Sequence, residues 1–107
     1  MDNSFVAVCT VDDVKEFKST VFKLGDSSIL LTKIGADIYA FENKCSHENV
    51  PFGEREIING QIQCPMHGSW FDLRTGAAIN LPATKAVAVY AVKRIGDDIY
   101  VEEPDDW

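Results

Sequence analysis

Two cysteines and two histidines are concentrated in a single stretch near the middle of the chain. They form two pairs, Cys45-Ser46-His47 and Cys64-Pro65-Met66-His67, separated by sixteen residues. Each pair offers one soft thiolate and one imidazole nitrogen, which are common metal ligands. The surrounding residues include several turn-formers, namely Pro51, Gly53, Pro65 and Gly68. Ordinary buried cysteines and histidines are not expected to cluster in this way, so the stretch predicts a metal site in two loops.

The segment between the two pairs contains Asn59-Gly60, which is a strong signal for a β-hairpin. Both positions of such a turn need a positive φ, and asparagine and glycine adopt it most readily. The dipeptide lies within Glu56-Ile57-Ile58-Asn59-Gly60-Gln61-Ile62-Gln63. We therefore expect a hairpin that brings the two ligand loops together at one end.

Two kinds of metal centre use two cysteines and two histidines. Structural zinc sites usually present two cysteines followed by two histidines. In a Rieske-type centre, two histidines replace two cysteines on one iron of a 2Fe–2S cluster. The order Cys-His then Cys-His, together with Cys64-Pro65-Met66-His67-Gly68-Ser69, resembles the Rieske family. The resemblance implies one [2Fe–2S] cluster, with Cys45 and Cys64 on one iron and His47 and His67 on the other. A zinc-stabilised binding module is the alternative.

Positions beside the ligands distinguish this chain from some Rieske proteins. Members in respiratory and photosynthetic complexes carry two cysteines that form a disulfide between the loops, where this chain has Val50 and Met66. They also carry a tyrosine that donates to a ligand sulfur, where this chain has Phe71. The loss of this donor predicts a reduction potential in the lower part of the family range of about −150 to +300 mV. Ser69 is expected either to donate to a bridging sulfide or to stabilise the turn.

Further loop residues are expected around the cluster. The resemblance implies a third, proline-containing loop that shields it, and Leu81-Pro82-Ala83 is the matching candidate, although these residues could also form a plain turn. Pro51, Phe52 and Met66, with Val50, are predicted to form an apolar collar on which partners dock. The aromatic residues beside the loops, Phe41, Trp70 and Phe71, are expected in the core.

The rest of the chain consists of short alternating runs separated by turns, with no long amphipathic helix. Strands are predicted over residues 5–9, 19–24, 28–34, 38–42, 70–73, 87–92 and 99–102. This pattern predicts an all-β fold, either an antiparallel sandwich or a partly open barrel. The resemblance implies a single Rieske domain over residues 1–107. Its base would comprise residues 1–42 and 84–107, with a cluster-binding subdomain inserted at about residues 43–83.

Composition limits the partners. The chain has 107 residues and a formal net charge of −7, which argues against binding to nucleic acid. The acidity fits either a basic protein partner or solubility alone. The first residues are acidic, unlike a secretory signal, and no apolar run reaches the ~20 residues of a membrane span. A cytoplasmic monomer that does not bind membranes is expected, with Cys9 as a buried residue on a strand.

A cluster ligated entirely by protein has no open coordination position for a substrate. The sequence therefore predicts a one-electron carrier rather than an enzyme, with no catalytic residues. The chain resembles the ferredoxin components of multicomponent dioxygenases that act in the catabolism of aromatic hydrocarbons. This resemblance implies a flavin-containing, NAD(P)H-dependent reductase as donor and a terminal Rieske oxygenase as acceptor. A small Rieske subunit of another redox enzyme, such as a nitrite reductase, is the alternative.

Overall fold

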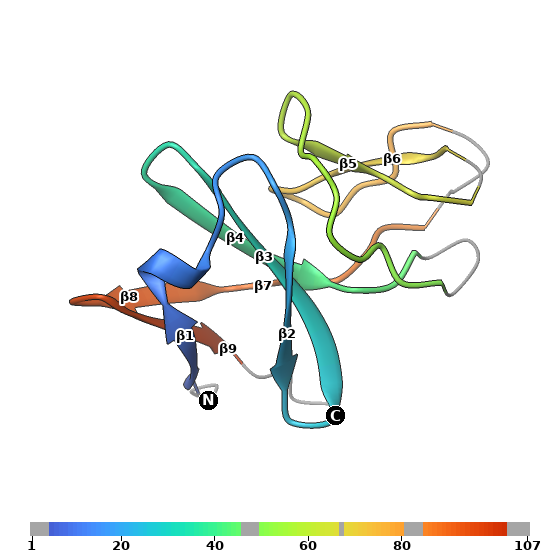
Figure 1. Cartoon of the computed structure of the whole chain (residues 1–107). Helices are drawn as coiled ribbons and strands as arrows, with labels where there is room; N and C mark the ends of the chain where they lie inside the picture. Colours follow the sequence, from blue (N-terminus) through green and yellow to red (C-terminus); the bar gives the residue numbers. More distant parts are fainter. Residues whose placement is uncertain (1–4, 46–49, 67, 81–84, 103–107) are drawn as a thin grey trace.

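The computed structural model describes residues 5–45, 50–66, 68–80 and 85–102 (Figure 1). The predicted positions His47, His67 and Pro82 lie outside these residues. The strands are β1 Phe5–Thr10, β2 Thr20–Leu24, β3 Ser27–Ile34, β4 Asp37–Glu42, β5 Gln61–Gln63, β6 Trp70–Asp72, β7 Val89–Tyr90, β8 Val92–Ile95 and β9 Asp98–Glu102. Within the described ranges the only helical element is a 3₁₀ turn, Val11–Asp13, and no helix has the length and hydropathy of a membrane span. The predicted all-β fold is confirmed.

The strands form three antiparallel sheets, in the orders β1-β9-β8, β2-β3-β4-β7 and β5-β6. Consecutive strands pair across tight turns at Gly25, Gly35 and Gly96, all of which have a positive φ. These turns and hairpins are those that the sequence predicts. Because β1 pairs with β9, the two ends of the described chain lie side by side (Figure 1).

The alternating run at residues 87–92 is not the single strand that its sequence predicts. Its first part, β7, pairs with β4, whereas β8 pairs with β9 in a different sheet. Ala91 lies between the two strands, and its carbonyl accepts a hydrogen bond from the Glu102 N–H (2.9 Å). A chain that passes from one sheet to another in this way forms a corner between them. The run therefore links the two larger sheets instead of lying within one.

The four-stranded sheet β2-β3-β4-β7, called the middle sheet below, is covered on both faces. In β3, Ile29 and Leu31 pack into a core with Ile99 and Val101 of β9, whereas Leu30, between them, packs into a second core. All of these side chains are fully buried, so the centre of β3 is a continuous apolar run rather than an alternating one. The β5–β6 sheet lies on the face of the second core, away from β1, β8 and β9 (Figure 1).

The second core combines residues from distant parts of the chain. Its buried members are Leu30, Phe41, Cys45, Phe52, Ile57, Ile62, Cys64, Phe71, Leu73 and Val87. Leu30, Phe41 and Val87 belong to the part of the sequence assigned to the base, and the others belong to the predicted insertion. The two parts therefore share one core and are not packed independently.

The backbone of Gly76 closely approaches the backbone of Val87, which belongs to the second core. The Gly76 carbonyl accepts a hydrogen bond from the Val87 N–H (2.8 Å), and the φ of Gly76 is +80°. A Cβ at this position would overlap the carbonyl group of Val87. Gly35 has a similar backbone conformation, with φ +62°, but open space around the corresponding position. Gly76 is therefore required both for its conformation and for its lack of a side chain.

Alanine substitutions at these two glycines should separate the two requirements. We expect Gly35→Ala to lower the free energy of unfolding by about 1–2 kcal/mol, the cost of a left-handed conformation for an L residue. Gly76→Ala also forces a backbone shift, so we expect a larger loss of about 3 kcal/mol. Denaturant unfolding of both variants in the same metal-bound state measures the difference. Equal losses at the two positions would contradict the close approach.

Candidate metal centre

Two of the four predicted ligands lie in the same apolar core. Cys45 is 0% exposed and Cys64 is 2% exposed, and both belong to the second core. A thiolate in apolar surroundings is costly unless a positive charge or hydrogen-bond donors compensate it, and a bound metal does so directly. The structure thus brings together two soft donors that lie nineteen positions apart in the sequence, in an environment that suits a metal more than a free thiolate.

Each of these cysteines opens a loop that is closed in the same way. The Cys45 N–H donates to the Val50 carbonyl (2.7 Å), and the Cys64 N–H donates to the Ser69 carbonyl (2.7 Å). In both cases the acceptor is the fifth residue after the cysteine, and the intervening sequence contains one predicted histidine ligand. The backbone hydrogen bond made by the cysteine is therefore the same in both segments.

A side chain also supports the second loop. Gln63, the last residue of β5, donates from Nε2 to the Gly68 carbonyl (3.2 Å), and the Gly68 N–H donates to the Cys64 carbonyl (3.2 Å). Gly68 has φ +77°, and a Cβ there would lie 3.3 Å from the Gln63 amide nitrogen. Glycine is therefore the residue that fits this position.

The predicted turn between the two pairs is confirmed, but it is short. Asn59 and Gly60 have φ values of 54° and 73°, and Ile58 and Gln61 exchange two backbone hydrogen bonds of 3.0 Å. Before the turn, the chain pairs with the base instead, since the Ile57 N–H donates to the Phe17 carbonyl (2.9 Å). The shared core, rather than a long hairpin, accounts for the common location of the two cysteines.

Three aromatic rings pack beside the cysteines. Phe52 meets Phe41 edge-to-face with ring centroids 6.2 Å apart, and it meets Phe71 in the same manner at 5.6 Å. Phe41 and Phe71 are fully buried, as predicted, whereas Trp70 is only half-buried. Ser69 is fully buried in the second loop. These rings exclude water from the surroundings of the thiols.

The predicted apolar collar is partly wrong. Phe52 is only 3% exposed because its ring fills the space between two other aromatic rings, so its side chain is not available for docking. Val50 is half-buried and packs against the same core. Pro51 is exposed, and Met66 is 58% exposed. Among the described residues, these two remain as candidate docking positions.

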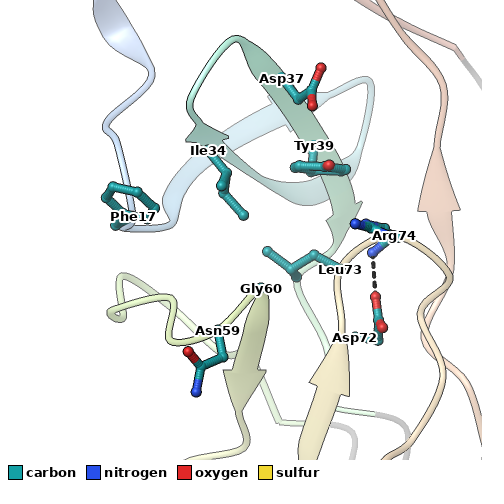
Figure 2. Close-up of a pocket in the computed structure, with 9 residues that line it drawn as sticks. All are labelled: Phe17, Ile34, Asp37, Tyr39, Asn59, Gly60, Asp72, Leu73 and Arg74. Carbon is teal, nitrogen blue, oxygen red and sulfur yellow. Dashed lines mark hydrogen bonds between the residues drawn. The ribbon is translucent and has the colours of Figure 1, made fainter.

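A cavity of about 650 Å³ lies at the end of the β5–β6 sheet that is opposite the second cysteine loop (Figure 2). It is bordered by the Asn59-Gly60 turn before β5 and by Leu73 and Arg74 after β6, and the Arg74 N–H donates to the Asp72 carboxylate (2.7 Å). The second cysteine loop joins the opposite ends of these two strands. The cavity lining contains no cysteine or histidine, so the cavity is separate from the candidate metal centre.

The third cysteine lies elsewhere in the structure. Cys9 is on β1, as predicted, but it is only partly buried and packs against the core between the two larger sheets. Burial, and secondarily the negative charge of Asp13, raises the pKa of the Cys9 thiol to about 11. A protonated thiol is a poor metal ligand, so Cys9 is not part of the candidate centre.

Comparison with known proteins identifies the family. Residues 4–91 match the Rieske [2Fe-2S] domain. The chain belongs to this family. It is 32% identical over 102 residues to the 3-phenylpropionate/cinnamic acid dioxygenase ferredoxin subunit of Escherichia coli (strain K12), with 94% of both chains covered.

Solved structures agree with this family assignment. The ferredoxin of carbazole 1,9a-dioxygenase from Nocardioides aromaticivorans IC177 is 33% identical, with a TM-score of 0.83 over 92% of this chain and 96% of that one. A chain from a complex of reduced oxygenase and oxidised ferredoxin of carbazole 1,9a-dioxygenase is 25% identical, with a TM-score of 0.81 and 94% of both chains covered. The resemblance read from the sequence is thus confirmed.

The family also settles the cofactor. A Rieske domain holds a [2Fe–2S] cluster, so the predicted cofactor is confirmed in preference to zinc. The described part of the site fits this group, because two cysteine side chains lie in one apolar core and each cysteine opens a loop closed by its own backbone hydrogen bond.

The raised pKa of Cys9 can be tested by alkylation. At pH 8 we expect Cys9 to react with iodoacetamide about a hundredfold more slowly than an ordinary exposed thiol, because only the thiolate reacts. The rate should keep rising with pH up to about 11, where half of the thiol is ionised. Peptide mass spectrometry measures this rate for Cys9 alone. A plateau already reached near pH 9 would contradict the raised pKa.

Proposed function

We propose that this chain is the ferredoxin component of an aromatic-ring dioxygenase system. It would carry single electrons from a flavin-containing, NAD(P)H-dependent reductase to a terminal Rieske oxygenase. The main support is the end-to-end similarity to a dioxygenase ferredoxin subunit, which covers 94% of both chains. A similar ferredoxin in a solved complex with an oxygenase supports the second partner.

The proposed ligands are Cys45 and Cys64 for one iron and His47 and His67 for the other. When bound, the cluster supplies a centre that exchanges one electron at a time. The burial of both cysteines in one core and the matching closure of their loops support this assignment. Because two cysteines come from two loops, the cluster also links these loops to each other.

The chain's own residues supply a dry and stable setting for this exchange. Phe52 and Phe71 keep water away from the cysteine side of the site. The backbone closures limit how far each loop can move when the charge of the centre changes. Pro51 and Met66, which are exposed, are the proposed contacts for both partners. Such contacts are small and transient, because a carrier must leave each partner.

Charge and cysteine chemistry suggest the setting in which the carrier works. Its net charge of −7 favours partners with basic docking surfaces, which would speed association at low salt. Val50 and Met66 occupy the positions of the disulfide found in other Rieske proteins, and a site without a disulfide suits a reducing compartment. We therefore propose that the carrier is cytoplasmic.

Substitution of individual ligands tests the proposed centre. The wild-type protein should contain about two irons per chain and give an EPR signal after dithionite reduction. Cys64→Ala and His67→Ala should lose both, because each removes a ligand. Cys9→Ala is the matched control and should keep both, because Cys9 packs against the other core. One zinc per chain and no EPR signal would contradict the proposed function.

The same preparations distinguish the dioxygenase system from other redox partners. Oxygen uptake by a terminal aromatic-ring oxygenase and its reductase should depend on added wild-type protein and remain unsupported by His67→Ala. Electron delivery to a nitrite reductase, without delivery to such an oxygenase, would favour the alternative function.

The environment of the ligands predicts a low reduction potential. Phe71 cannot donate a hydrogen bond to sulfur, so we expect a midpoint below about 0 mV, in the lower part of the family range. Phe71→Tyr restores a donor at this position and should raise the midpoint if its hydroxyl reaches a ligand sulfur. Protein-film voltammetry measures both values. A wild-type midpoint well above zero would contradict the predicted low potential.

A further inference from the structure

Asn43 lies two residues before Cys45 and uses its backbone N–H and both ends of its side-chain amide. Its Nδ2 donates to the Ser28 hydroxyl (2.9 Å), and its Oδ1 accepts from the Gly53 N–H (3.0 Å). Its backbone N–H donates to the Ser28 carbonyl (3.2 Å). The residue is partly buried. Asn43 therefore joins three segments: the end of β4, the start of β3, and the chain that follows the first cysteine loop.

Gly53 is also held from its other side. Ser19 is fully buried, and its hydroxyl donates to the Gly53 carbonyl (2.7 Å) and accepts from the Arg55 N–H (2.8 Å). Gly53 has φ +71°, with open space where a side chain would be. Both polar backbone groups of Gly53 are thus bound by side chains from other segments. This leaves the residue little freedom to move relative to the middle sheet.

These contacts enclose the first cysteine loop in two successive closures. The inner closure is the hydrogen bond from Cys45 to Val50, and the outer one runs from Asn43 to Gly53. The inner closure joins Cys45 to Val50 but does not itself connect the loop to a sheet. The outer closure does so, because the same carboxamide is bound to Ser28 of β3.

The second cysteine loop has a different support. Its side-chain contact runs from Gln63 to Gly68, so both partners belong to the β5–β6 hairpin itself. The first loop is therefore anchored to the middle sheet, and the second loop is anchored to the β5–β6 sheet. A cluster that takes ligands from both loops requires the two loops to keep a fixed position relative to each other.

We propose that Asn43 is the positioning residue of the metal centre, the side chain that fixes the first ligand loop relative to the middle sheet. The inference rests on the proposed function, because it takes Cys45 and His47 as ligands. Asn43 acts through the backbone of this loop and is assigned no contact with the cluster. Residues that hold ligands in this way commonly change metal affinity by about tenfold to a hundredfold when they are replaced.

Three variants test this role. Asn43→Ala removes both side-chain hydrogen bonds, and Ser28→Ala is a milder change that removes the acceptor of Asn43 Nδ2 and leaves the Gly53 contact. Ile99→Val is the matched control, because it removes one methylene from the core between the larger sheets and touches neither loop. Hydrogen exchange of loop peptides in the protein as isolated, the EPR g values and the rate of iron loss to a chelator are compared with wild type.

Asn43→Ala should speed amide exchange over residues 44–54 while leaving residues 64–72 close to wild type. It should also shift the EPR g values and release iron about tenfold faster. Ser28→Ala should change the same three measurements in the same direction but less. Ile99→Val should reduce overall thermal stability without any of these local changes.

Two results would overturn the proposal. The first is unchanged exchange over residues 44–54 in Asn43→Ala, and the second is an effect of Ile99→Val on exchange and g values equal to that of Asn43→Ala. A wild-type protein without a two-iron cluster would refute the proposed function separately, since the exchange comparison does not require the cluster. In that case, unchanged amide exchange over residues 44–54 in Asn43→Ala would still show that Asn43 does not restrain the loop.

Discussion

The burial of two thiols in one apolar core is the constraint on which this structure depends. Cys45 and Cys64 are almost completely removed from solvent, among aliphatic and aromatic side chains. As thiolates they would carry two negative charges into a medium that solvates charge poorly. A cluster that neutralises these charges therefore contributes to the stability of the core itself, and binding of the cluster and folding of this part of the chain are linked.

The shared middle sheet explains how such a site can be rigid in a chain of 107 residues. Alternate residues of β3 face different cores, so Leu30 supports the metal side while Ile29 and Leu31 support the other. A displacement of β3 would disturb both cores at once. The first cysteine loop is consequently attached, through Asn43 and Ser28, to a strand whose centre is fully buried. Such an attachment suits a centre that must keep its geometry in two oxidation states.

Local sequence signals predicted most of the fold, and they failed where tertiary contacts decide. The glycine turns and alternating runs located the hairpins correctly. Residues 87–92 form one unbroken apolar run, so their pattern could not reveal the change of sheet at Ala91. Phe52 lies between two turn-forming residues and resembles an exposed loop position. Its burial depends on Phe41 and Phe71, which are distant in sequence.

The same distinction applies to the site. The proposed ligand pairs stand out in the sequence because their chemistry is contained in three or four consecutive residues, whereas no motif singles out Asn43. Its partners, Ser28 and Gly53, lie 15 and 10 positions away, so only the folded chain shows their connection. The chemistry of a metal centre can therefore be read from short motifs. Its rigidity arises from polar contacts between segments, and these contacts have no local signature in the sequence.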